Sequence, residues 1–178
     1  MELIEQRFEE PRFLKTLILD RDGTIILDQE YGADIAQLQL IGKSLDALRK
    51  ISRFSVNLFI ATNQGGLALG RFSHLELINF NLALQNSLYE NGIVINGVLS
   101  CPHHENALDL SNRICNCRKP KTGMLERIQA ITKSPKENMA MIGDSWRDLE
   151  VASNFDVQFF DACDENGWRD STDWCEKS

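Results

Sequence analysis

The 178-residue sequence lacks three features that would place it in a specialised class of protein. It has no apolar run long enough to cross a membrane, and its opening residues MELIEQRFEEPRF are too acidic and too broken for a signal peptide. It has no surplus of basic residues, since 19 Lys and Arg stand against 26 Asp and Glu, and the net charge of -7 disfavours a large nucleic-acid interface. It also shows no internal repeat and no linker. We therefore expect a single cytoplasmic domain over residues 1–178, monomeric and without a membrane or nucleic-acid partner.

Cysteine is sparse, but three of the five cysteines lie within 17 residues of one another. Because the expected compartment is reducing, such a cluster indicates metal ligation before a disulfide. The cluster and a nearby histidine supply three thiolates and one imidazole, from Cys101, His103, Cys115 and Cys117. This is a closed tetrahedral set of the kind that holds structural Zn²⁺, and it leaves no open position for a substrate. We predict a zinc-binding loop at residues 101–118, with His104 less suited as a ligand, and we disfavour a catalytic zinc hydrolase.

Short apolar runs alternate with helical patterns along most of the chain. The strands are expected at residues 15–19, 56–61, 93–100, 139–142 and 157–160, and the helices at 41–54, 73–90, 122–132 and 149–154. This alternation indicates βαβ units and a mostly parallel sheet with helices on both faces, which is a three-layer α/β/α, Rossmann-like fold. Residues 15–161 would form the core, with a polar lead-in at 1–14, a small flap at 28–40 and a polar tail at 162–178 that carries Cys163 and Cys175.

The stretch LILDRDGTI places two carboxylates at the end of the first expected strand. Ligands of open α/β sheets bind in the crevice at the carboxyl ends of the strands, so Asp20 and Asp22 would lie in that crevice. One carboxylate can face a hard cation and a phosphorus atom, while the other carries a proton. Asp-x-Asp-Gly also occurs in ordinary turns, so this motif alone does not decide the function.

Three further polar motifs follow later strands, each with a simpler structural alternative. Thr62 and Asn63 offer a hydroxyl and backbone N–H groups to a phosphate, or merely end a strand. Arg118 and Lys119 can neutralise a phosphoryl group, although a basic pair is more often solvated surface. Asp144 can complete a Mg²⁺ site with Asp20, or it can cap the next helix together with Ser145. The order of the motifs, each after a strand, predicts one phosphate site.

In this order, DRDGT, ATN, RKPKTGM and GDSWRD resemble the four motifs of the haloacid dehalogenase-type (HAD-like) phosphotransferases. The resemblance implies that Asp20 is a nucleophile that forms an aspartyl-phosphate and that Asp22 is its general acid and base. It further implies that Thr62 holds the phosphoryl oxygens and that Lys119 balances the charge on Asp20. Mg²⁺ would then be bound by Asp20, Asp144 and the backbone carbonyl of Asp22.

The zinc loop narrows the resemblance to the heptose-1,7-bisphosphate 7-phosphatases and the related histidinol-phosphate phosphatases, and its length favours the former. The resemblance implies a Mg²⁺-dependent hydrolase of a small phosphorylated metabolite. Its implied substrate contacts are Asp28, Gln29, Glu30 and Tyr31 of the flap, Thr62, Asn63, Gln64 and Gly65 of the phosphate loop, and Arg118, Lys119 and Ser145. Two segments depart from the family, TNQGG in place of TNQSG and an unusual flap, and both leave the substrate open. Histidinol phosphate and a catalytically silent, zinc-stabilised scaffold remain as alternatives.

Overall fold

The computed structural model describes residues 1–29 and 32–177, which form a six-stranded sheet in the order β1-β4-β3-β2-β5-β6. The strands are β1 (Ile4–Arg7), β2 (Lys15–Leu19), β3 (Val56–Asn63), β4 (Gly97–Cys101), β5 (Met139–Gly143) and β6 (Gln158–Asp161). The α-helices are α1 (Gly42–Ile51), α2 (His74–Glu90), α3 (Gly123–Thr132), α4 (Trp146–Phe155) and α5 (Gly167–Glu176). All neighbouring strands are parallel except β1 and β4. Among the described residues, no helix has the length and apolarity that a membrane span requires.

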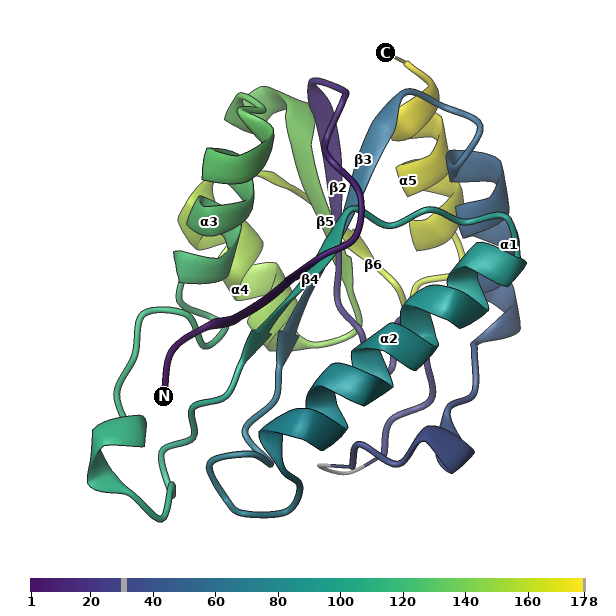
Figure 1. Ribbon diagram of the computed structural model, residues 1–178. Coiled ribbons are helices and arrows are strands. Elements are labelled where there is room, and N and C mark those ends of the chain that lie inside the picture. The colour runs from purple at the N-terminus through teal and green to yellow at the C-terminus, as the bar shows by residue number, and fades with distance from the viewer. Residues whose placement is uncertain (30–31, 178) are drawn as a thin grey trace.

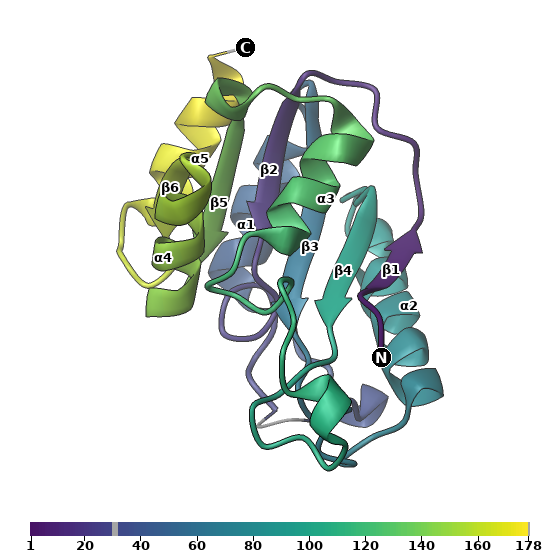
Figure 2. The ribbon, with the colours of Figure 1, turned by 90° about the vertical axis from the view of Figure 1, so that its left-hand side faces the viewer.

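The sheet is sandwiched between two helical layers, because its central strands are apolar on both faces. Side chains alternate along a strand, so Leu17 and Leu19 join one buried cluster, with residues of α1, α2 and α5, while Ile18 joins the other, with residues of α3 and α4. Figures 1 and 2 show these two layers and place the loops that follow the parallel strands together beyond one end of the sheet. The predicted three-layer α/β/α fold is confirmed.

The N-terminal segment differs from the expected polar lead-in, because β1 extends the sheet at its edge. It pairs antiparallel with β4, with Ile4 opposite Ser100 and Arg7 opposite Gly97. A Cβ atom on Gly97 would lie 2.7 Å from the carbonyl oxygen of Gln6, so glycine allows the two backbones to pair. A four-residue, half-exposed edge strand leaves too short an alternation to be read from sequence.

The strand expected at residues 93–100 begins only at Gly97. Before it, the backbone N–H of Asn96 donates to the carbonyl of Leu58, and its side-chain Oδ1 accepts from the N–H of Leu58. The backbone and side chain of Asn96 therefore replace the regular hydrogen bonds between β3 and β4 at this point. Ile93 and Ile95 are still buried, which is why their segment has the composition of a strand.

The C-terminal tail folds back as α5 beside α1, an outcome that the polar composition of the tail left open. Trp168 and Cys175 are buried in the same core cluster as α1, and Lys15 Nζ donates to the carbonyl of Trp174 at 2.7 Å. A Cβ atom on Gly167 would lie 1.7 Å from the carbonyl oxygen of Asp161, so α5 can start here only on glycine. The helix is thus part of the core.

Docking of α5 predicts a large difference in reactivity between the two tail cysteines. Burial raises the pKa of the Cys175 thiol to about 12, whereas Cys163 is exposed. In native protein treated with iodoacetamide at pH 8, peptide mass mapping should find Cys163 alkylated and Cys175 protected until denaturant is added. Similar alkylation rates for both thiols in the native state would show that α5 is not docked.

Candidate active site

The predicted motifs converge at the carboxyl ends of β2, β3 and β5, where they line a cleft of about 610 Å³. The acidic lining residues are Asp20, Asp22, Asp28 and Asp144, and the basic ones are Arg21, Arg71, Arg118, Lys119 and Arg147. Thr62, Asn63, Gln64, Gly66 and Ser145 complete the polar wall. The cleft thus presents carboxylates and cations within reach of one small ligand, as the strand order requires.

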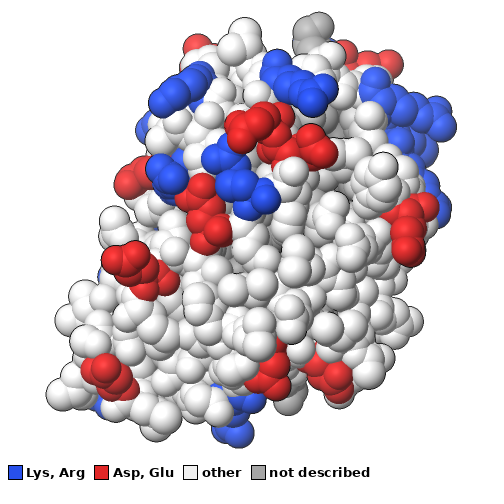
Figure 3. All heavy atoms as spheres, viewed as in Figure 1, with Lys and Arg blue, Asp and Glu red and all other residues white. Residues whose placement is uncertain are grey.

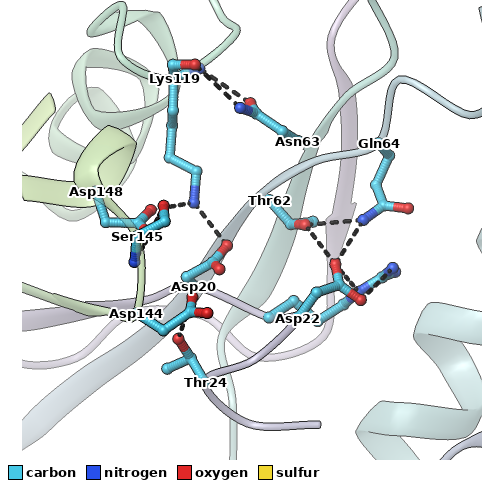
Figure 4. Close-up of polar contacts among 11 residues, drawn as sticks. Asp20, Asp22, Thr24, Thr62, Asn63, Gln64, Lys119, Asp144, Ser145 and Asp148 are labelled. Carbon is cyan, nitrogen blue, oxygen red and sulfur yellow. Dashed lines mark hydrogen bonds and ion pairs between the residues drawn. The ribbon is translucent and has the colours of Figure 1, made fainter. Parts of the chain in front are cut away.

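Lys119 connects the segment after the zinc loop to the two acidic motifs. Its Nζ lies 2.6 Å from Asp20 Oδ1 and 2.6 Å from Asp148 Oδ1, between the two carboxylates in Figure 4. All three side chains are buried or nearly so. Burial alone would lower the pKa of Lys119, but the two carboxylates hold it above its ordinary value. Lys119 is therefore a fixed cation beside Asp20.

The acidic residues form a cluster that fits one divalent cation. Oxygen atoms of Asp20, Asp144 and Asp148 lie within 4.8 Å of one another. Burial raises the pKa of Asp20 to about 7, helped by Asp148 and Asp22 and opposed by Lys119, and burial also raises the pKa of Asp144. Three carboxylates and one ammonium leave two negative charges. Hard oxygen ligands with this excess charge suit Mg²⁺.

Asp144 reaches Asp20 because the backbone at Gly23 leaves room for it. Gly23 has a φ of +75°, and a Cβ atom there would lie 2.1 Å from Asp144 Oδ2. The hydroxyl of Thr24 donates to Asp144 Oδ1 at 3.2 Å. The DGT turn after β2 therefore both bends the chain and aims a carboxylate that comes from the end of β5.

Asp22 points away from the acidic cluster, toward β3 and α2. Its Oδ2 accepts hydrogen bonds from Gln64 Nε2 at 2.9 Å and Thr62 Oγ1 at 3.3 Å (Figure 4), and both its oxygens accept from Arg21 at 3.1 Å. Its side chain is absent from the acidic ligand cluster, so only its backbone carbonyl remains as a candidate Mg²⁺ ligand. The two aspartates of the DRDGT motif thus have different surroundings, as different chemical roles require.

Asn63 locks the backbone of the cationic loop to β3. Its Nδ2 donates to the carbonyl of Lys119 at 3.0 Å, and its Oδ1 accepts from the N–H of Lys119 at 2.9 Å. These reciprocal bonds fix where the lysine side chain begins. The side-chain amide of Asn63 therefore positions Lys119, while the residue also lines the cleft.

The predicted zinc ligands lie together next to the cleft. Ligand atoms of Cys101, His103, Cys115 and Cys117 are within 4.8 Å of one another, and His103 presents its Nδ1 to the sulfurs at 3.4 to 3.6 Å. The hydrogen bond between Cys101 and Cys117 lowers the pKa of Cys117 to about 6 and raises that of Cys101, so the two sulfurs share one proton, which Zn²⁺ would displace. On its other side, His103 Nε2 lies 2.9 Å from the carbonyl of Met1, which suits an Nε2–H donor and fixes Nδ1 as the ligating nitrogen.

The same loop orients Arg118. The N–H of Arg118 donates to Cys115 Sγ at 3.4 Å, and its guanidinium donates to the carbonyl of His103 at 2.9 Å. A Cβ atom on Gly65 would lie 2.7 Å from the ring of His104 and 3.0 Å from the Arg118 guanidinium. Gly65 therefore packs beneath the zinc loop, and its neighbour Gly66 lines the cleft.

Only some of the remaining residues expected to contact the substrate line the cleft. Asp28 and Ser145 line the cleft, and both amide atoms of Gln29 are buried without a hydrogen-bond partner among the described residues. Glu30 and Tyr31 lie outside the described residues. The sequence interpretation did not identify three arginines of the cleft, Arg21, Arg71 and Arg147, and it assigned no role to Asp148. Arg21 and Arg147 lie inside the DRDGT and GDSWRD motifs, but the resemblance gave them no role.

Comparisons with known proteins place this site in a family. A HAD-hydrolase-like family model matches residues 116–160. The D-glycero-beta-D-manno-heptose-1,7-bisphosphate 7-phosphatase of Haemophilus influenzae is 35% identical over 138 residues, which cover 77% of this chain and 74% of the relative. The chain belongs to the heptose-1,7-bisphosphate 7-phosphatase family. The Escherichia coli K12 member of this family is 31% identical over 76% of the chain and 72% of its own length.

Solved structures agree with this family assignment. The D,D-heptose 1,7-bisphosphate phosphatase of B. bronchiseptica, crystallised with magnesium and phosphate, matches with a TM-score of 0.73 and 28% identity over 83% of this chain and 79% of its own. A HAD-like protein of Mesorhizobium loti matches with a TM-score of 0.90 and 25% identity over 98% and 93% of the two chains. The predictions of a HAD-like phosphatase, of Mg²⁺ and of a zinc-binding cluster are confirmed at this level.

The contact between Gly23 and Asp144 predicts a specific loss in the Gly23→Ala variant. The added methyl group must displace the Asp144 carboxylate, so calorimetry should show Mg²⁺ affinity reduced by about 10- to 100-fold, the usual effect of disturbing a ligand's support. Gly92→Ala is the matched control, because Gly92 has a φ of +78° and open space around it. Equal Mg²⁺ affinity in the two variants would contradict the placement of Asp144 as a ligand.

Proposed function

We propose that this protein is a Mg²⁺-dependent phosphatase that removes the 7-phosphate of D-glycero-D-manno-heptose 1,7-bisphosphate through an aspartyl-phosphate on Asp20. The observation that carries the proposal is the pairing of Asp20 with the buried cation Lys119, in a cleft whose wall also carries three arginines that form no ion pair with a carboxylate among the described residues. The substrate is inferred from the names of the relatives, and the reaction is inferred from the residues of the cleft.

In the first half-reaction, a carboxylate oxygen of Asp20 attacks phosphorus and the bond to the sugar oxygen breaks. Lys119 and the hydroxyl of Thr62 compensate the negative charge of the phosphoryl oxygens, and Asp22 gives its proton to the departing alkoxide. When bound at Asp20, Asp144 and Asp148, Mg²⁺ supplies the positive charge that lets an anionic nucleophile approach a phosphate dianion.

In the second half-reaction, Asp22 is ionised and accepts a proton from the water that attacks the aspartyl-phosphate. Release of inorganic phosphate restores the carboxylate of Asp20 and the proton on Asp22. Gln64 Nε2 and Arg21 Nε hold Oδ2 of Asp22 on the β3 side of the cleft, so both proton transfers take place at Oδ1, which accepts only from Arg21 Nη2 among the described residues. The Thr62 hydroxyl, which donates to Oδ2 in the structure, turns to a phosphoryl oxygen when the substrate is bound. One carboxylate thus acts on both sides of the intermediate.

The basic residues of the cleft favour a substrate with two phosphates. Within the part of the chain that the structure describes, Arg71, Arg118 and Arg147 form no ion pair with a carboxylate, although all three line the cleft. Arginine grips a phosphate bidentately, so these side chains offer a second anion site beyond Lys119. Histidinol phosphate, with one phosphate and a cationic amine, suits this wall less well.

The outer surface is consistent with a small anionic ligand. On the face seen in Figure 3, acidic and basic side chains are mixed, mainly toward the end of the sheet where the parallel strands begin, and no continuous basic band follows the described surface of that face. A polyanion needs such a band along its backbone. The cations useful for binding phosphate are instead those in the cleft.

A panel of phosphate esters tests the proposal. With Mg²⁺ present, phosphate release from heptose 1,7-bisphosphate should have the highest kcat/KM, above that from heptose 7-phosphate and histidinol phosphate. Asp20→Asn should lose at least about 10³-fold in kcat, because it removes the attacking oxygen's charge. Comparable turnover by Asp20→Asn, or a preference for histidinol phosphate, would contradict the proposal; ester binding without turnover would indicate the scaffold alternative.

A further inference from the structure

Arg21 lies between the two aspartates of the DRDGT motif, yet it is among the most completely buried large side chains of the protein, with 1% of its surface exposed. Burying a guanidinium is costly unless its charge and its N–H groups are matched by partners. The surroundings of Arg21 therefore show what its charge is used for. Asp22 is its sole ion-pair partner among the described residues.

The contacts of Arg21 form a clamp on Asp22. Nε donates to Asp22 Oδ2 and Nη2 donates to Asp22 Oδ1, both at 3.1 Å, which is the parallel fork that arginine makes with a carboxylate. The clamp holds both carboxylate oxygens, so it fixes the rotation of the side chain as well as its position. The oxygen Oδ2 is thereby turned toward Gln64 and Thr62.

The clamp is itself anchored on α2. Arg21 Nη1 donates to Asn81 Oδ1 at 3.1 Å, and the guanidinium carbon lies 4.7 Å from the centre of the Phe80 ring. Asn81 Nδ2 in turn donates to Gln6 Oε1 at 2.7 Å. A rigid helix on the core side thus determines where Arg21 holds Asp22. The other three arginines of the cleft, Arg71, Arg118 and Arg147, form no ion pair with a carboxylate in the described part of the chain.

We propose that Arg21 is a positioning residue that fixes the Asp22 carboxylate at the distance and rotation needed for proton transfer to the leaving oxygen. The inference rests on the proposed function, because it assigns that transfer to Asp22. As the Asp20 oxygen–phosphorus bond forms and the phosphorus–oxygen bond to the sugar breaks, the Asp22 proton passes to the sugar oxygen. An error of about 1 Å in the position of such a group can cost about 10²-fold in rate.

The leaving group separates a positioning role from general damage to the site. A sugar alkoxide needs the proton of Asp22 to depart, whereas p-nitrophenolate is a weak base that departs without it. For Arg21→Gln, kcat/KM should fall about 10²-fold on heptose 1,7-bisphosphate and by less than about threefold on p-nitrophenyl phosphate. Arg21→Lys keeps the charge without the fork. Its kcat/KM on heptose 1,7-bisphosphate should therefore fall by a smaller factor than that of Arg21→Gln, and again by more than its kcat/KM on p-nitrophenyl phosphate.

Two other variants keep the test decisive if Arg21→Gln does not fold. Asn81→Ala removes the anchor while leaving the clamp itself, and it should also reduce kcat/KM for the sugar phosphate more than kcat/KM for the aryl phosphate. Arg127→Gln is the matched control, since its ion pair with Glu5 is exposed and lies outside the cleft. Equal losses on both substrates, or no loss, in the folded Arg21 and Asn81 variants would overturn the role of Arg21. Failure of the wild type on sugar phosphates would instead overturn the proposed function.

Discussion

The site depends on the burial of one ammonium between two carboxylates. Lys119 lies within 2.6 Å of Asp20 and of Asp148, and a third carboxylate, Asp144, belongs to the same cluster. Burial raises the pKa of Asp20 to about 7, and the neighbouring carboxylates Asp148 and Asp22 add to that shift against the opposing effect of Lys119. A divalent cation held by these carboxylates would offset their excess negative charge, and their hard oxygen atoms suit Mg²⁺.

The rest of the fold holds these charges in place. Parallel strands bring the ends of β2, β3 and β5 to one edge, and helices on both faces bury the strands. The zinc cluster and Asn63 fix the loop that carries Lys119 from two sides. Arg21 and α2 hold Asp22 apart from the cluster. The zinc cluster, whose four ligands all come from the protein, thus supports the acidic cluster beside the cleft, and the two clusters have no residue in common.

The sequence predicted what depends on strong local patterns. The buried strands, the helix expected at residues 73–90, the four motifs and the cysteine spacings all specify their structures locally. It could not predict β1, because a four-residue edge strand is defined by its neighbour, nor the docking of α5, whose few buried side chains are spread among charged ones. Arg71 and Arg147 were missed for a similar reason, since a cleft lining is determined by tertiary placement.

A double-mutant cycle on Lys119 and Asp148, measured by chemical unfolding without Mg²⁺, tests the electrostatic account most directly. Lys119→Met leaves two buried carboxylates without a counter-charge and should lower the free energy of unfolding by about 3–5 kcal/mol. Lys121→Met, on the exposed surface, is the control and should lower it far less. Adding Asp148→Asn to Lys119→Met should recover a large part of that loss, because it removes one unpaired charge. If the two substitutions instead lower stability additively, the buried ammonium is not what balances the acidic cluster.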